Sequence, residues 1–155
     1  MELYLQLGHG MKALAQEWNT TTRRKTMEFN KLVPELSVTN IDVSKHFYID
    51  ILNFKLEYER KDDKFAFLSY QGSQLMIEQI NDNWNVGALE YPLGRGINFQ
   101  IETNEIEEIS KRLKENNINI YKDIFKSEYI ADGEVFEESE LLVQGPDGYL
   151  LRFTD

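Results

Sequence analysis

The stretch TNIDVSKHFYIDILNFKL, residues 39–56, has a counterpart 64 positions later in TNEIEEISKRLKENNINI, residues 103–120. In each copy a Thr-Asn pair, with Asn40 or Asn104, precedes a segment whose apolar residues have helical spacing. A second asparagine, Asn53 or Asn117, comes just before a short apolar–polar–apolar run. Asparagine is favoured at the first residue of a helix and in the left-handed conformation that ends one. The repeat therefore predicts two related halves, each containing one helix followed by a strand.

Strand-like segments flank both helices in the same order. Those of the first half are LVPELSV (32–38), FKLEYER (54–60), FAFLSY (65–70) and SQLMIEQ (73–79). Those of the second half are GINFQIE (96–102), INIYKDIF (118–125), ELLVQ (140–144) and YLLRF (149–153). We expect an α+β fold of two paired βαβββ modules, about residues 31–80 and 95–155, that form a curved mixed sheet around a cleft. Such a cleft is a natural ligand site.

The composition limits the classes of site and partner. The 155 residues include no cysteine and two histidines, which excludes disulfides and thiolate metal sites and leaves little for an imidazole-rich one. Lys and Arg number 17 against 27 Asp and Glu, a net charge of −10. An acidic chain repels phosphate groups, so we expect neither nucleic acid nor anionic membrane as a partner, whereas cationic ligands remain possible. No long apolar run or signal-peptide pattern is present, so we expect a cytoplasmic protein.

The strand and helix segments together resemble a known family. LVPELSV, VSKHFYIDILNFKLEY, FAFLSYQGSQLMIEQ, GRGINFQIE and the closing QGPDGYLLRF are similar, in this order, to the vicinal oxygen chelate superfamily, particularly its bleomycin-resistance-protein-like branch. The resemblance implies the glyoxalase fold over residues 29–155. It does not extend to residues 1–28, and Met27 stands where such a protein commonly begins. We therefore expect residues 1–28 to be an N-terminal extension of unknown role.

The resemblance also bears on metal chemistry. Metal-dependent relatives carry His or Glu ligands on four strands, and the matching positions here are Val33, Glu78, Gly96 and Arg152. Glu78 is the one residue of the four that can bind a metal, so we expect neither a metal nor another cofactor. Arg152 is expected to pair with Glu78 across the cleft floor or to bind an anionic ligand group. Alternatively, this pair is structural and holds the two halves together.

Polar residues on the first strand of each half are candidate ligand contacts. Alternation puts Glu35 and Ser37 on one face of their strand, and Asn98 and Gln100 on one face of theirs. Facing the cleft they would orient a ligand. The alternative is that they face solvent or bond to the backbone.

Aromatic and acidic residues complete the candidate site. Phe65 matches an aromatic position with which drug-binding relatives stack flat heterocycles, and Trp84 lies on the loop between the halves. Two further aromatic positions of the branch fall around Asn98 and Glu137, which are polar. The acidic run ADGEVFEESE (131–140), which includes Glu137, borders the groove in relatives and would attract a cationic ligand. The alternatives are that the aromatics fill the core or a dimer interface, and that the acidic run is a solvated loop.

The sequence thus predicts a metal-free small-molecule binding protein of the bleomycin-resistance type. It would sequester a planar or cationic compound, with antibiotic resistance as one outcome. We expect it to have no catalytic residues and to form a homodimer. One alternative is a metal-dependent lyase, isomerase or dioxygenase of the same superfamily. Another is a regulatory or interaction module that binds no ligand.

Overall fold

The computed structural model describes residues 27–84 and 86–155. The predicted extension over residues 1–28 lies outside the described residues except for residues 27 and 28, so it stays a prediction. No helix in the described part of the chain is long and apolar enough to span a bilayer.

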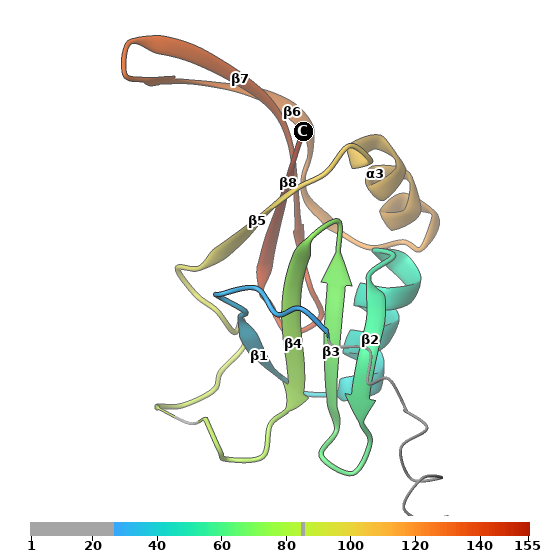
Figure 1. Ribbon diagram of the computed structural model, residues 1–155. Helices are drawn as coiled ribbons and strands as arrows, with labels where there is room; N and C mark the ends of the chain where they lie inside the picture. Colours follow the sequence, from blue (N-terminus) through green and yellow to red (C-terminus); the bar gives the residue numbers. More distant parts are fainter. Residues whose placement is uncertain (1–26, 85) are drawn as a thin grey trace, which may run out of the picture.

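The described residues form two four-stranded mixed sheets, one from each half of the chain (Figure 1). The first half contains β1 (Glu35–Val38), α2 (Ile41–Lys45), the π-helix η1 (His46–Ile51), β2 (Lys55–Arg60), β3 (Phe65–Tyr70) and β4 (Ser73–Gln79). The second contains β5 (Asn98–Glu102), α3 (Ile106–Glu115), β6 (Ile120–Ala131), β7 (Glu134–Gln144) and β8 (Leu150–Thr154). The strand orders, β1-β4-β3-β2 and β5-β8-β7-β6, are equivalent, with one parallel pair in each sheet. The predicted α+β fold of two βαβββ modules is confirmed.

Asparagine ends both helical segments, as the repeat predicts. Asn53 and Asn117 have φ angles of 64° and 55°, the left-handed conformation that stops a helix. At the opposite end the two copies differ. The Asn40 side chain accepts hydrogen bonds from the backbone of Asp42 and Val43, whereas α3 begins after Glu105 without a side-chain cap. The prediction that Asn104 opens its helix is therefore wrong, because its side chain accepts from Gln71 Nε2 instead.

The first helix is also not the single α-helix that the sequence predicts. It widens to π geometry from His46, and the Leu52 N–H bonds to the Phe47 carbonyl five residues back. The apolar side predicted for this segment is nevertheless confirmed, since Ile41, Phe47, Ile51 and Leu52 are all buried. The wider turn also buries Tyr48.

One hydrophobic core joins the two modules. It contains Leu36, Ala66 and Ile77 from the first sheet and Leu151 and Phe153 from the second, among others. A turn at Asp147 ties the halves together further. Its buried carboxylate accepts from Thr39 N at 2.7 Å, from Thr39 Oγ1 at 2.6 Å and from Ser44 Oγ at 2.8 Å.

The acidic run over residues 131–140 is not a solvated loop, as one interpretation of the sequence had it. Most of it belongs to β7, which pairs with β6 in a long hairpin that projects from the body of the molecule (Figure 1). The hairpin turns at Asp132 and Gly133, whose φ angles are 51° and 84°. An Asp-Gly pair with two positive φ angles makes the tight turn that best matches strand twist, and Tyr129 stacks on Phe136 just below it. The Asp-Gly turn and the aromatic pair extend the hairpin beyond the strand segments 118–125 and 140–144 that the apolar pattern predicts.

Candidate functional site

A hollow of about 720 Å³ lies against the first sheet, on the face opposite the core. Strand alternation explains why this sheet has one core face and one hollow face. Leu36, Ala66 and Ile77 enter the core, while their neighbours along each strand point the other way. The described residues that line the hollow all come from the first module and the loop after it. They are Glu35, Tyr58, Arg60, Asp62, Asp63, Lys64, Phe65, Met76, Glu78, Gln79, Ile80, Asn81, Asn83 and Trp84.

Aromatic rings form one wall of the hollow. The Phe65 ring centroid lies 5.8 Å from that of Tyr58, and Tyr58 in turn stacks on the fully buried Phe67 at 5.4 Å. The guanidinium carbon of Arg60 lies 3.9 Å from the Phe65 ring centroid, within cation–π range. Phe65 is therefore part of the hollow, although the Arg60 side chain covers its face.

Two carboxylates lie beside these rings. The strand register places Glu78 beside the Phe65 ring, because Phe65 on β3 pairs with Glu78 on β4. Its Oε2 accepts a hydrogen bond of 3.1 Å from the Trp84 indole, and its Oε1 lies 4.0 Å from Arg60 Nη2. Burial and the neighbouring Glu78 carboxylate raise the pKa of Glu35. Two neighbouring carboxylates repel each other when both are ionised, and a bound cation would relieve this repulsion.

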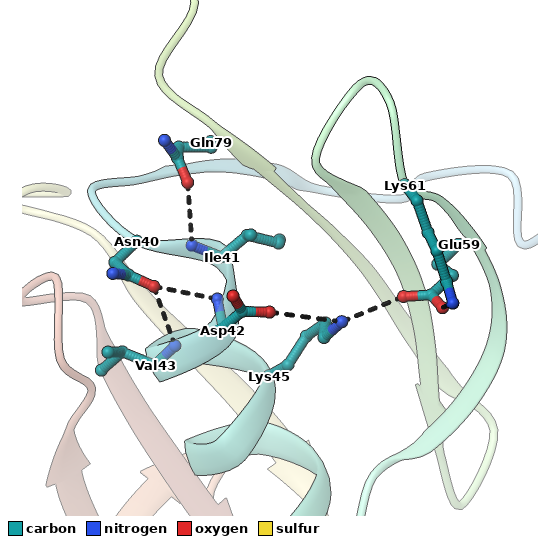
Figure 2. A network of polar contacts seen from close by, with 8 residues as sticks. All are labelled: Asn40, Ile41, Asp42, Val43, Lys45, Glu59, Lys61 and Gln79. Carbon is teal, nitrogen blue, oxygen red and sulfur yellow. Dashed lines mark hydrogen bonds and ion pairs between the residues drawn. The ribbon is translucent and has the colours of Figure 1, made fainter.

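A polar network fixes the strand end that carries Arg60 (Figure 2). Lys45 from the first helix donates to Glu59 Oε2 at 3.0 Å and lies 3.6 Å from Asp42, while Lys61 lies 3.4 Å from Glu59 Oε1. The hydrogen bond to Glu59 raises the pKa of Lys45, and the same bond lowers the pKa of Glu59. The network thus joins the end of β2 to α2 through Lys45, the last residue of that helix.

Arg152 lies in a second, separate hollow of about 390 Å³ against the other sheet. Its guanidinium bonds to Gln100 Oε1 and lies 3.5 Å from Glu140 Oε2. Gln100 is the register partner of Arg152 on β5, so these contacts lie within one sheet. The Nε of Arg152 is buried and has no hydrogen-bond partner among the described residues. The described residues contain no Glu78–Arg152 pair within the chain, which corrects the sequence prediction. The cause is that each residue finds its partners in its own module.

The other candidate residues from the sequence do not line the first hollow. Ser37 accepts a hydrogen bond from the Tyr149 hydroxyl through its backbone carbonyl, at 3.0 Å. Asn98 is exposed on β5. Glu137 is exposed on the projecting hairpin, opposite Glu128 in register. The structure therefore brings Glu35, Phe65, Glu78 and Trp84 together and leaves Ser37, Asn98, Gln100, Glu137 and Arg152 outside this group.

Tyr58 and Arg60 are the most important of the lining residues that the sequence did not predict. Alternation in the strand segment FKLEYER puts both on the face of Phe54 and Leu56, which pack in the core. A register shift between Leu56 and Tyr58 turns the end of the strand over, and the sequence gives no clear signal of it. The hairpin register then pairs Arg60 with Phe65 and Tyr58 with Phe67.

The residues present do not fit a divalent metal. In the part of the chain that the structure describes, no three His, Cys, Asp or Glu side chains converge as a metal site would need. Of the four positions discussed above, Glu78 carries the one suitable side chain, and its oxygens face Trp84 and Arg60.

Comparison with known proteins was consistent with this fold. A family model described as "Glyoxalase/Bleomycin resistance protein/Dioxygenase superfamily" matches residues 29–153. A solved superfamily member from Vibrio splendidus 12B01 is 39% identical, covers 79% of this chain and 95% of its own, and has a TM-score of 0.36. A glyoxalase/bleomycin resistance protein/dioxygenase from Alicyclobacillus acidocaldarius is 24% identical, with coverages of 83% and 93% and a TM-score of 0.55. TioX from Micromonospora sp. ML1 is 17% identical, with coverages of 81% and 98% and a TM-score of 0.61. No curated protein matches the chain.

Proposed function

Because the chain belongs to the glyoxalase/bleomycin resistance protein/dioxygenase superfamily, we propose that it is a metal-free binding protein for a planar or cationic small molecule. The observation that carries the proposal is the hollow of about 720 Å³, which combines aromatic rings with the carboxylates of Glu35 and Glu78. Rings provide a stacking surface at low entropic cost, and carboxylates select positive charge. Together the rings and the carboxylates support recognition of a flat, positively charged ligand.

The bleomycin-resistance-like branch fits this chemistry. In such a protein the ligand is sequestered and not converted, so antibiotic resistance would follow from removing a drug from solution. The metal-dependent reactions of the superfamily need several ligands around one ion. The donor set at this hollow supplies two neighbouring carboxylates, Glu35 and Glu78, and the described residues contain no group of three potential ligands. We place the protein in the cytoplasm on the basis of the sequence pattern alone.

A homodimer is part of the proposal. Each of the two hollows against the sheets is lined, among described residues, by one module, so each remains open on its outer side within one chain. Apolar side chains are also exposed on the hairpin, including Ile130 at 75% and Val135 at 63%. A second copy would cover such surfaces and enclose a ligand more completely.

The test is a thermal-shift screen of the purified protein against flat heterocyclic drugs including bleomycin, polyamines and divalent metals. A ligand that binds the native state alone raises the melting temperature by mass action. We expect planar cations to raise it and metals to leave it unchanged. A rise with Zn, Ni, Fe or Mn and none with any organic compound would contradict the proposal.

A further inference from the structure

Arg60 already occupies the corner of the hollow where a cation would bind. Its guanidinium carbon lies 3.9 Å from the Phe65 ring centroid, and its Nη2 lies 4.0 Å from Glu78 Oε1. A guanidinium is flat, delocalised and weakly hydrated, which suits it both to an aromatic face and to a carboxylate. The chain therefore presents one example of the kind of group that this corner accepts.

The contacts of Arg60 in this corner are loose. The 4.0 Å separation from Glu78 exceeds a hydrogen-bond length, and the Arg60 side chain is 49% exposed whereas that of Glu78 is 9% exposed. Among the described residues its close ion pair is with Asp63, whose Oδ2 lies 2.9 Å from Nε, on the turn between β2 and β3. Exposed ion pairs of this kind contribute little net stability. Arg60 can thus leave the Phe65 face at small cost while Asp63 still holds it.

The charge of the hollow favours an incoming cation once Arg60 has moved. Four acids line it against two bases, namely Glu35, Asp62, Asp63 and Glu78 against Arg60 and Lys64. The Trp84 indole donates to the other oxygen of Glu78, which leaves Oε1 for the ligand. An amidinium or guanidinium could therefore place its flat face on Phe65 and its N–H edge on Glu78.

We propose that the ligand of this site is a planar delocalised cation, of the guanidinium or amidinium class with an apolar group attached, and that it binds by displacing Arg60 from Phe65 and Glu78. This inference rests on the proposed function, since it concerns the same hollow. It adds the chemical class of the ligand and a built-in competitor. The competitor lowers the apparent affinity by the fraction of time that it holds the corner.

The test compares two variants that each remove one positive charge from the lining, Arg60→Gln and Lys64→Gln. The probe is the benzamidinium ion, titrated calorimetrically into the full chain, with neutral benzamide as its isosteric control. We expect Arg60→Gln to bind benzamidinium about 2- to 5-fold more tightly than the parent, the ratio that corresponds to one exposed cation–π contact. Lys64→Gln should change the affinity less than about 2-fold, because it alters charge without uncovering Phe65.

The outcomes separate this inference from the proposed function. If Arg60→Gln binds benzamidinium no more tightly than Lys64→Gln, the displacement is overturned. In that case a loss of binding in Glu78→Gln would still support the hollow as the site. If benzamide binds the parent as tightly as benzamidinium does, the site does not select a cation and the ligand class is wrong. Circular dichroism checks that the Arg60→Gln variant remains folded, as expected for a substitution at a half-exposed side chain.

Discussion

At the scale of single residues, the site depends on the sheet register that places a ring beside an acid. Phe65 and Glu78 are register partners on β3 and β4, and Arg60 is the partner of Phe65 on β2. Three residues from three strands thereby meet at one point of the sheet face. The contribution of each can be tested separately, because a ring, a negative charge and a competing cation affect binding in different ways.

The Phe65 ring is expected to anchor the ligand. Phe65→Leu keeps an apolar side chain but removes the stacking surface, so we expect it to weaken binding of a planar ligand by about 1 to 3 kcal/mol. The matched control is Phe99→Leu, which removes a partly buried ring that packs against Tyr149 outside the hollow. Calorimetric titration measures both. Equal affinities of Phe65→Leu and the parent would show that this ring does not contact the ligand.

The sequence predicted which residues line the site only at positions that the family resemblance or strand alternation points to. Phe65, Glu78, Trp84 and Glu35 were predicted and do lie together. Arg152 was assigned to the same cleft because the resemblance aligns four strands, but which partner it takes depends on how the modules pack. Its own sheet supplies Gln100 and Glu140. Such long-range packing leaves no local trace in the sequence.

At the scale of elements, the repeat predicted both helices and most strands because helix spacing and strand alternation are local signals. FAFLSY and SQLMIEQ match β3 and β4 end to end. The β6–β7 hairpin is longer than the apolar pattern predicts. Its outer part is held by cross-strand pairs such as Tyr129 and Phe136 and not by burial, so it leaves no apolar pattern in the sequence. The π turn that begins at His46 was not predicted either, because the apolar spacing of the segment fits an ordinary α-helix.

The two Thr-Asn pairs give an internal comparison of helix capping. Asn40 accepts from the Asp42 N–H at 3.0 Å and from the Val43 N–H at 3.1 Å, so Asn40→Ala should lower the free energy of unfolding by about 1 kcal/mol. Asn104→Ala is the control, because Asn104 precedes α3 without capping it. We expect the control to cost less than about 0.5 kcal/mol. Chemical denaturation measures both, and equal losses would contradict the assigned caps.

The network in Figure 2 should make the stability of the fold depend on pH in acid. The hydrogen bond from Lys45 lowers the pKa of Glu59 below its ordinary value of 4.5, so this carboxylate stabilises the fold above that pH. The contribution is lost as the pH falls through the lowered pKa. The melting temperature of the parent should therefore fall more steeply than that of Glu59→Gln between about pH 6 and about pH 3. Parallel curves would show that the pair does not stabilise the folded state; Glu115→Gln, in an exposed pair with Lys111, serves as the control.

At the scale of the whole molecule, two sheets share one core but keep separate outer faces. The two hollows are lined by different modules. The β6–β7 hairpin extends from the body of the molecule (Figure 1), and several of its apolar side chains are exposed. Both features leave surface that a second chain would cover. The sequence predicted a homodimer from sheet edges and family resemblance, and the structure adds this open surface as a physical reason.

We expect the protein to be a dimer at micromolar concentration. Multi-angle light scattering measures the mass directly, and a dimer has twice the 18.3 kDa of one chain. Val135→Lys, on the exposed part of the hairpin, should shift the equilibrium toward the monomer if the hairpin lies in the interface. A single species of one-chain mass in the parent would count against the dimer.

The central claim is that a planar cation binds the hollow without a metal, and one titration tests it most directly. The best compound from the thermal-shift screen is titrated calorimetrically into chelator-dialysed protein, and again after a divalent metal is restored. We predict saturable binding at one site per chain, with the same affinity in both titrations. Binding that appears only after the metal is restored would contradict the claim.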